Sequence, residues 1–265
     1  MSGIVFISIY NFLIFRNCYY SSKRNVTRYQ VSEYLGHDSL EETAQKHNFN
    51  NWLYEQIFSG IRGDVLEVGS GIGTYSEKII RDFPNSQITL SDVSETYVKI
   101  LKSKFTLENI QVFRFDLDVR SNYDSIGFEK FDTIIAINVL DNVRNDEFAL
   151  QQLYKMLKKG GMLLLLLPAH KFLYNQLDIN IGRLRRYSQK ELELKIEKTN
   201  FKTIRSFHFN LMGAVGWFFN GKSGKNPKIN DSAFKIFDKM ILVSKAVERI
   251  TMKRFGLSII CYLKK

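Results

Sequence analysis

The chain has 265 residues, 45% of them hydrophobic, and a formal net charge of +11. This length and composition are typical of one sizeable globular domain of α/β type with additions. The two cysteines, Cys18 and Cys261, lie near opposite ends of the chain with no Cys or His pattern beside them. The sequence therefore predicts neither a disulfide framework nor a metal site, and it favours a reducing, cytoplasmic setting.

The excess of positive charge limits the kinds of partner. A basic field favours anionic molecules, whether phosphorylated small molecules, nucleic acid or a negatively charged membrane surface. Lysines are concentrated in the segment from Lys222 to the C-terminus. Charge alone does not choose among these partners.

The first residues contain an apolar run from Gly3 to Phe15. The run is shorter than the ~20 residues that cross a bilayer, is interrupted by Asn11 and lacks a basic leader. We therefore expect neither a signal peptide nor a spanning helix, which leaves a docked extension, a peripheral membrane contact or poorly ordered sequence. Residues 1–47 are expected to form this apolar segment and a polar connecting arm, and residues 48–265 the main domain.

Strands and helices alternate along the main domain. We expect a helix over 48–58, strands over 64–68, 87–91, 110–114 and 131–137, a helix over 146–158, strands over 162–167 and 202–209, a long amphipathic helix over 232–249 and a last strand over 257–263. Regular alternation of this kind predicts a mostly parallel sheet with helices on both faces.

A glycine-rich turn follows the first predicted strand. Gly69, Gly71 and Gly73 stand at alternate positions, and glycines at such a corner let the backbone approach a ligand closely. A dinucleotide turn would place its third glycine where Thr74 stands. Glu67 lies two positions before the first glycine, and a buried carboxylate there would repel a pyrophosphate but would be satisfied by an ammonium or sulfonium group.

Asp92 follows the second strand, ~20 residues after the turn, which is the spacing at which nucleotide-binding sheets place an acid on the ribose hydroxyls. A carboxylate can accept both vicinal O–H groups at once. The alternative is that Asp92 caps the helix that begins after it. We favour the ribose contact because of its position.

The heptapeptide E-V-G-S-G-I-G at positions 67–73 resembles the first motif of class I S-adenosylmethionine-dependent methyltransferases, and the segments from 49 to 211 follow in that family's order. A turn in another Rossmann-like protein is the alternative. The resemblance implies a Rossmann-like sheet of seven mostly parallel strands with an antiparallel last strand, and S-adenosylmethionine as the cofactor. The predicted cofactor contacts are Glu67, Gly69, Ser70, Gly71, Gly73, Asp92, Val93, Asp116, Leu117 and Asn138.

Two acidic positions gain their expected roles from this resemblance. In the family, an acid at the place of Asp116 receives the exocyclic amine of adenine. Asp116 and Asp118 together also resemble the metal-binding pair of many glycosyltransferases, but nothing else in the chain supports that interpretation. In the loop after the fourth strand, Asp141 preserves the family's acid, whereas Asn142 stands where some oxygen methyltransferases have a histidine beside the substrate.

His170 is the best-placed candidate for a catalytic base, because it follows the fifth strand and the ordinary pKa of histidine, ~6.5, lets it accept a proton near neutrality. Methyl transfer depends mainly on alignment, and it needs a base only when the accepting atom still carries a proton. Tyr174 and Asp178 are predicted to orient His170 or the substrate. A structural role is the alternative for a loop histidine.

The run from Pro168 to Tyr187 resembles a bacterial branch of the family that is often associated with glycosyltransferases and envelope polysaccharides. Arginines beside the mouth of the site would suit a phosphate or carboxylate of the acceptor, with a solvated basic turn as the alternative. The aromatic segment 211–219 could form a lid, a substrate wall or core, within a lid or insertion expected around 210–250. The predicted substrate contacts are Arg183, Arg186, Tyr187 and Trp217.

We therefore predict an S-adenosylmethionine-dependent methyltransferase that acts at oxygen on a small-molecule or glycan-type acceptor, anionic or lipid-linked. One alternative is an RNA methyltransferase, which the charge suggests, although the loop 138–141 lacks the signatures of adenine-N6 and cytosine-C5 enzymes. Another is a non-catalytic cofactor-binding or scaffold protein, because the loop histidine is replaced by Asn142. A lysine-rich loop after aromatic residues would also suit a peripheral contact with an anionic membrane.

Overall fold

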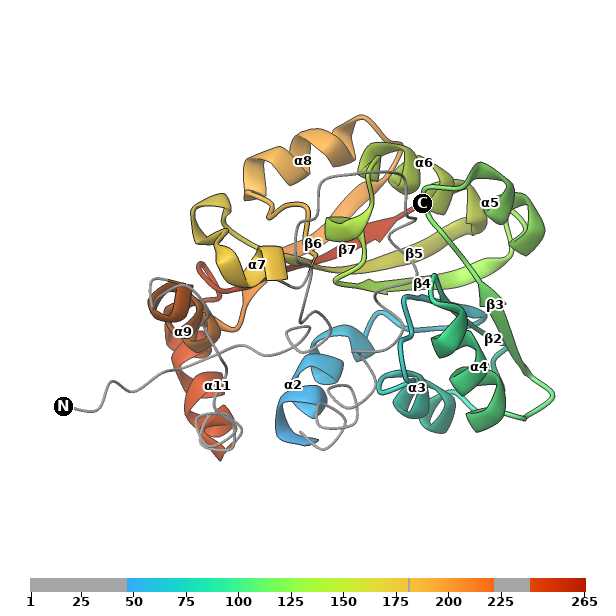
Figure 1. The fold of residues 1–265 in the computed structure, drawn as a ribbon, viewed down its shortest axis with the longest axis horizontal. Helices are drawn as coiled ribbons and strands as arrows, with labels where there is room; N and C mark the ends of the chain where they lie inside the picture. Colours follow the sequence, from blue (N-terminus) through green and yellow to red (C-terminus); the bar gives the residue numbers. More distant parts are fainter. Residues whose placement is uncertain (1–46, 181, 222–238) are drawn as a thin grey trace, which may run out of the picture.

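The computed structural model describes residues 47–180, 182–221 and 239–265. The expected N-terminal segment and arm lie outside the described residues, as does part of the expected lid, residues 222–238. Across the described ranges, no helix is long and apolar enough to cross a bilayer. The described chain folds around one central sheet with helices on both sides (Figure 1).

Seven strands form the sheet in the order β3-β2-β1-β4-β5-β7-β6, and β7 alone runs in the direction opposite to the other six. This arrangement confirms the predicted Rossmann-like sheet. The order reverses between β1 and β4, so their carboxyl ends form the switch point at which open α/β sheets bind ligands. The strands are β1 (Val65–Val68), β2 (Ile88–Asp92), β3 (Ile110–Arg114), β4 (Phe131–Ile137), β5 (Leu157–Pro168), β6 (Lys202–Phe209) and β7 (Ser258–Lys264).

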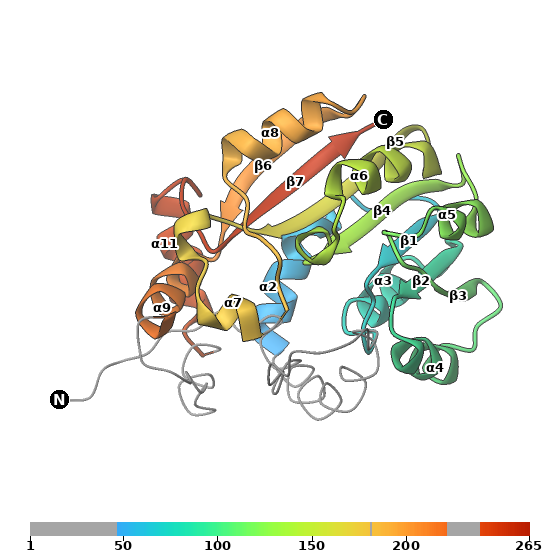
Figure 2. The ribbon, with the colours of Figure 1, turned by 45° about the horizontal axis from the view of Figure 1, so that its top comes forward.

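Two layers of helices cover the sheet (Figures 1 and 2). One face packs against α2 (His47–Phe58), α3 (Ser76–Asp82), α4 (Glu95–Lys104) and α11 (Ile241–Ile250). The other face packs against α5 (Arg120–Ile126), α6 (Asp146–Met156) and α8 (Gln189–Glu197). Three short segments, η1 (Leu140–Asn142), η2 (Lys171–Leu173) and α7 (Gln176–Asn180), connect the elements, and the longer α9 (Leu211–Gly221) follows β6.

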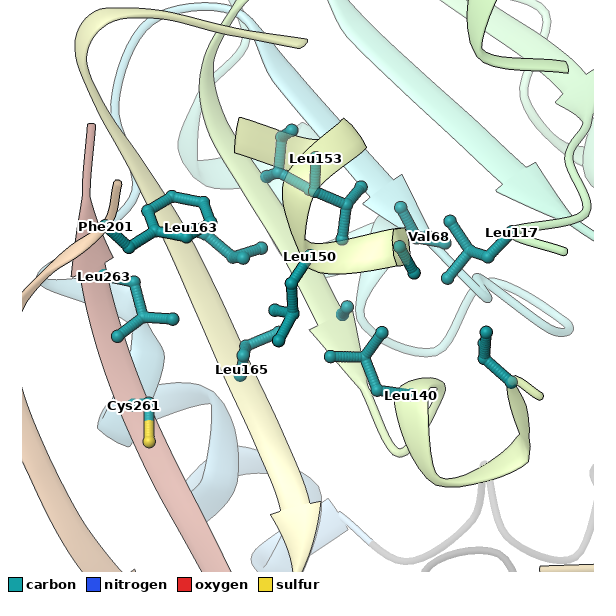
Figure 3. Close-up of a cluster of buried hydrophobic side chains, with 14 of the residues drawn as sticks. Val68, Leu117, Leu140, Leu150, Leu153, Leu163, Leu165, Phe201, Cys261 and Leu263 are labelled. Atoms are coloured by element: carbon teal, nitrogen blue, oxygen red, sulfur yellow. The ribbon is translucent and has the colours of Figure 1, made fainter. Parts of the chain in front are cut away.

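The core lies on both faces of β5, whose leucines alternate between the layers. Leu163 and Leu165 pack with α6, where Leu150 and Leu153 point toward the sheet (Figure 3). Leu164 belongs to the opposite cluster beside α2. A parallel strand buried on both faces needs a continuous apolar run, and the leucine run of this strand supplies it.

The helix expected over 146–158 ends earlier than predicted. α6 ends at Met156 and β5 begins at Leu157, so the expected helix cap at Lys158 to Gly161 lies within the strand. The register between β4 and β5 shifts there, and the Lys158 Nζ binds carboxylates of Asp64 (2.8 Å) and Asp132 (2.7 Å) at the ends of neighbouring strands. These tertiary contacts outweigh the local pattern of cations and glycines that favoured a helix end.

Candidate active site

The glycine-rich turn adopts a backbone that only glycine takes without strain. Gly69, Gly71 and Gly73 have φ values of +73°, +56° and +85°. A Cβ on Gly69 would lie 2.5 Å from Val139, and one on Gly73 would lie 2.6 Å from the Phe105 ring. A Cβ on Gly71 would meet no atom within 4 Å. Packing therefore explains two of the glycines, whereas Gly71 borders open space.

Glu67 is a buried carboxylate at the end of β1, directly before this turn. Its Oε2 accepts a hydrogen bond from the hydroxyl of Ser76 at the start of α3. Burial raises the pKa of Glu67 to about 7, although the Ser76 and Ser70 hydroxyls oppose the shift. No basic side chain of the described ranges forms an ion pair with it. A bound cation would satisfy this carboxylate.

Asp92 joins the end of β2 to the glycine-rich turn. Its Oδ2 accepts from the Gly71 N–H at 2.9 Å, and its Oδ1 accepts from the Ser94 N–H at 2.9 Å. Burial raises the pKa of Asp92. Ser94, not Asp92, is the N-cap residue of α4, so the structure differs from the capping alternative. Each carboxylate oxygen has a second lone pair, which leaves Asp92 able to accept ribose hydroxyls.

The predicted adenine contact is at the end of β3. Asp116 is half-buried, and its Oδ1 accepts from the Asp118 N–H at 2.9 Å. The Asp118 carboxylate accepts from the Arg144 N–H, which ties this loop to the loop after η1. Among the residues that the structure describes, no three His, Cys, Asp or Glu side chains are grouped to hold a metal ion. Val93 is exposed beside β2, whereas Leu117 is buried in the core.

Three residues other than glycine have a left-handed backbone at the carboxyl ends of strands. Asn138 (φ +53°) follows β4, His170 (φ +61°) follows β5 and Asn210 (φ +67°) follows β6. Such conformations cost about 1–3 kcal/mol each and are concentrated at functional sites. The Asn138 N–H donates to the Leu166 carbonyl at 2.8 Å, which holds its turn against β5. The sharp turns lie along the edge that carries the switch point.

His170 lies in a stack of aromatic rings. Its imidazole is parallel to that of His208, with 4.8 Å between ring centroids, and to the Phe255 ring at 4.1 Å. The Nε2 atom is buried and has no hydrogen-bond partner among the described residues. Burial lowers the pKa of His170 to about 4, with smaller contributions from His208 and Arg186. Burial thus moves the pKa of His170 below the ordinary histidine value, and its role as a base stays a prediction.

Tyr174 and Asp178 contact arginines and not His170. The Tyr174 hydroxyl donates to the Arg183 carbonyl at 2.9 Å. The Asp178 carboxylate binds the guanidinium groups of Arg183 (2.7 Å) and Arg186 (2.9 Å). Neither residue forms a hydrogen bond with the His170 ring in this structure. Their predicted role in orienting His170 or the substrate stays a prediction.

A buried ion cluster joins the loops after β4 and β5. Arg183 binds Asp141 at 2.8 Å as well as Asp178, and Arg186 lies 4.6 Å over the Trp217 ring. The Trp217 Nε1 donates to Asp178 at 3.3 Å. All five side chains are buried. Both arginines are paired with carboxylates inside the protein. They therefore neither line an open, basic entrance to the site nor lie in a solvent-exposed turn, which were the two alternatives from the sequence.

The remaining predicted substrate residue, Tyr187, is also buried. Its hydroxyl lies 2.9 Å from the Asp146 Oδ2 and 3.1 Å from the Leu140 carbonyl. It therefore joins the segment after α7 to η1 and α6. Substrate contacts at Arg183, Arg186, Tyr187 and Trp217 stay predictions, and the contacts that the structure shows for these side chains are within the protein.

Sequence reasoning missed the residues that surround the candidate base. His208 and Phe255 stack on His170, but they lie in β6 and before β7, and no local pattern connects them to it. Ser76, which binds Glu67, gave a weak signal as a hydroxyl at the start of the helix after the turn. Only the folded sheet brings these segments together.

Comparison with known proteins finds similarity over part of the chain. Residues 66–163 match the family model for a methyltransferase domain. Malonyl-[acyl-carrier protein] O-methyltransferase 2 of Ilyobacter polytropus is 31% identical over 111 residues, which cover 42% of this chain and 39% of that protein. The chain thus spans about two fifths of the length of this curated relative.

Solved structures share the fold at low sequence identity. An S-adenosylmethionine-dependent methyltransferase from Mesorhizobium loti aligns with a TM-score of 0.58 and 11% identity, over 80% of this chain and 97% of that one. Phosphoethanolamine N-methyltransferase 2 of Haemonchus contortus, in complex with S-adenosyl-L-methionine, aligns with a TM-score of 0.58 and 15% identity, over 90% of this chain and 58% of that one.

Proposed function

We propose that this chain, a class I S-adenosylmethionine-dependent methyltransferase, transfers a methyl group to an oxygen atom of a small-molecule or glycan-type acceptor. The observation that carries the proposal is the buried Glu67 carboxylate, which has no cationic partner in the described chain, beside the open space at Gly71. A ligand that carries both an ammonium and a sulfonium group suits such a carboxylate.

The chain's own residues fit this cofactor. The open space at Gly71 admits a ligand close to the backbone, and the Asp92 carboxylate, which accepts from the Gly71, Val93 and Ser94 N–H groups, keeps lone-pair capacity for the ribose. Asp116 would receive the adenine amine, and Glu67 would bind the positively charged end. When bound, S-adenosylmethionine supplies an electrophilic methyl group on sulfur. The protein then has to align the acceptor and exclude water.

Oxygen is the proposed accepting atom. The relative from Ilyobacter polytropus is named as an O-methyltransferase, and the match to it supports this choice. A hydroxyl acceptor has to lose a proton, and His170 has a buried Nε2 without a partner in the described chain. A pKa of about 4 keeps this imidazole neutral at pH 7, so its lone pair is available, although the low pKa also makes it a weaker base.

The experiment measures transfer from methyl-labelled S-adenosylmethionine to a panel of acceptors: hydroxylated small molecules, glycans, lipid-linked glycans, carboxylic acids and RNA. We expect label on an oxygen of a small molecule or glycan. Label only on RNA would contradict the proposal. Cofactor binding without transfer to any acceptor would instead support a non-catalytic protein.

A matched pair of variants tests the base. His170→Phe keeps an aromatic ring in the stack but removes Nε2, whereas His208→Phe makes the same change on the neighbouring ring. For a hydroxyl acceptor we expect His170→Phe to lower kcat about 100-fold or more with cofactor affinity unchanged. His208→Phe should have a much smaller effect, and equal effects of the two changes would contradict the assignment.

A further inference from the structure

The helix α11 buries polar residues and exposes apolar ones, which is the opposite of an ordinary surface helix. Its buried positions include Ser244 and Glu248. Leu242 is 78% exposed, Ile250 is 80% exposed and Val243 is 50% exposed. Helices that pack on a core normally bury the apolar face and expose the polar one. The exposed leucine and isoleucine therefore need another explanation than packing within the described chain.

Contacts on the opposite side fix this orientation. The Glu248 Oε1 accepts from the backbone N–H of Asn210 and from that of Leu211 at the start of α9. Lys245 binds Glu55 of α2 at 2.7 Å, and Ile241 is buried in the core. Rotating α11 to hide its apolar side would break these contacts. The helix is therefore held with its apolar residues outward.

These outward residues form one continuous face. Leu242, Val243, Ala246 and Ile250 are exposed and fall on one side of the helix by their spacing. We call these four residues the α11 face. Figures 1 and 2 both show α11 beside α9 at one end of the molecule.

Among residues 239–265, which include the α11 face, every charged side chain but one is basic. From residue 239 to the C-terminus the only acidic residue is Glu248, and it is buried. Arg249 and Arg254 are exposed, and Lys239 is exposed at the end of the described segment. An exposed apolar face with basic residues beside it is the pattern of helices that lie in the interface of an anionic membrane. A contact between two copies through this face would bring like charges together.

We propose that the α11 face binds the surface of a bilayer that contains anionic lipids. Leucine and isoleucine side chains enter the boundary between headgroups and acyl chains, and the arginines bind lipid phosphates. This inference goes beyond methyl transfer and does not depend on the acceptor. α9, which contacts α11, also supplies Trp217 to the ion cluster, so α9 connects the proposed membrane-binding helix to the candidate active site.

Co-sedimentation of the full chain with vesicles tests the proposal. One set of vesicles contains phosphatidylcholine alone and the other contains phosphatidylcholine with phosphatidylglycerol. The test variant is Leu242→Glu with Ile250→Glu. The control is Leu194→Glu with Ile204→Glu, which makes the same charge change at an exposed leucine and an exposed isoleucine of α8 and β6.

We expect the unmodified chain to sediment with the anionic vesicles and the test variant to lose about tenfold or more in affinity, while the control changes much less. Equal binding by test and control variants, or no binding of the unmodified chain to anionic vesicles, would overturn the proposal. A dimer that the test variant dissociates would assign the face to a second copy instead. A lower Tm of the test variant than of the control would show that another part of the chain covers the α11 face. Calorimetry with S-adenosylmethionine is a separate measurement, which checks that each variant is folded and whether the proposed cofactor binds.

Discussion

At the scale of single residues, substitutions at two glycines distinguish a loss of cofactor affinity from a loss of stability. Gly71 and Gly160 both have a left-handed backbone and no atom within 4 Å of a Cβ. Alanine at either position should cost about 1–2 kcal/mol of stability because of its backbone conformation. Only Gly71→Ala places a methyl group at the open turn. We expect calorimetry to show at least about tenfold weaker S-adenosylmethionine binding for Gly71→Ala alone, and equal affinities would contradict the site.

The raised pKa of Glu67 leads us to expect that cofactor affinity depends on pH. Its pKa in the free protein is about 7, and a cationic ligand favours the ionised carboxylate. Affinity should therefore rise as pH increases, by about fivefold between pH 6 and pH 7, with release of a proton. Glu67→Gln should remove this rise while retaining any dependence that comes from the ligand's own amine. Calorimetry in buffers of different ionisation enthalpy measures both quantities, and an unchanged pH dependence in the variant would exclude Glu67 as the cause.

The lowered pKa of His170 leads us to expect that kcat/KM does not change through this group near neutral pH. Burial lowers its pKa to about 4, so the imidazole is already neutral at pH 5 and above. If it accepts the acceptor's proton, kcat/KM should fall with a slope of one below about pH 4 and should not change through this group between pH 5 and pH 8. A profile with a midpoint near 6.5 that His170→Phe removes would show that the residue titrates as an ordinary exposed histidine.

At the scale of elements, the buried ion cluster connects α7 and α9 to the loop after β4. Asp178→Asn would leave Arg183 and Arg186 with less compensation inside the protein. We expect denaturant unfolding to show a loss of about 3–5 kcal/mol, because breaking a buried pair leaves charge uncompensated. Glu147, which binds Lys198 at an exposed site, provides the control. Glu147→Gln should change stability by less than about 1 kcal/mol, and similar losses in both variants would contradict a structural role for the cluster.

Most elements could be predicted because their signals are local. The apolar run and glycines at β1, and the alternation that follows, place β1, β2, β3, β4 and β6 within about a residue of their observed bounds. The start of β5 could not be predicted, since Lys158 is held by acids from two other strands. Periodicity predicted an amphipathic helix that includes α11 but could not tell which face is buried, because that depends on Glu248 contacting α9.

At the scale of the whole molecule, the sheet brings residues from separate strands close together at its switch point. Glu67 from β1, Asp92 from β2 and Asn138 after β4 lie at carboxyl ends of adjacent strands. The sequence could place these residues at this edge of the sheet because each lies at or directly after the end of a predicted strand. The partners of the arginines could not be assigned, because Asp141 and Asp178 approach Arg183 only after the loops fold together.

A crystal structure of the chain with S-adenosylhomocysteine tests the central claim most directly. The account predicts that the nucleoside lies at the carboxyl ends of β1, β2 and β4, with the ribose on Asp92, the adenine amine on Asp116 and the amino acid end toward Glu67. A ligand bound elsewhere, or a turn at Gly71 that stays empty when the ligand is present in excess, would contradict it.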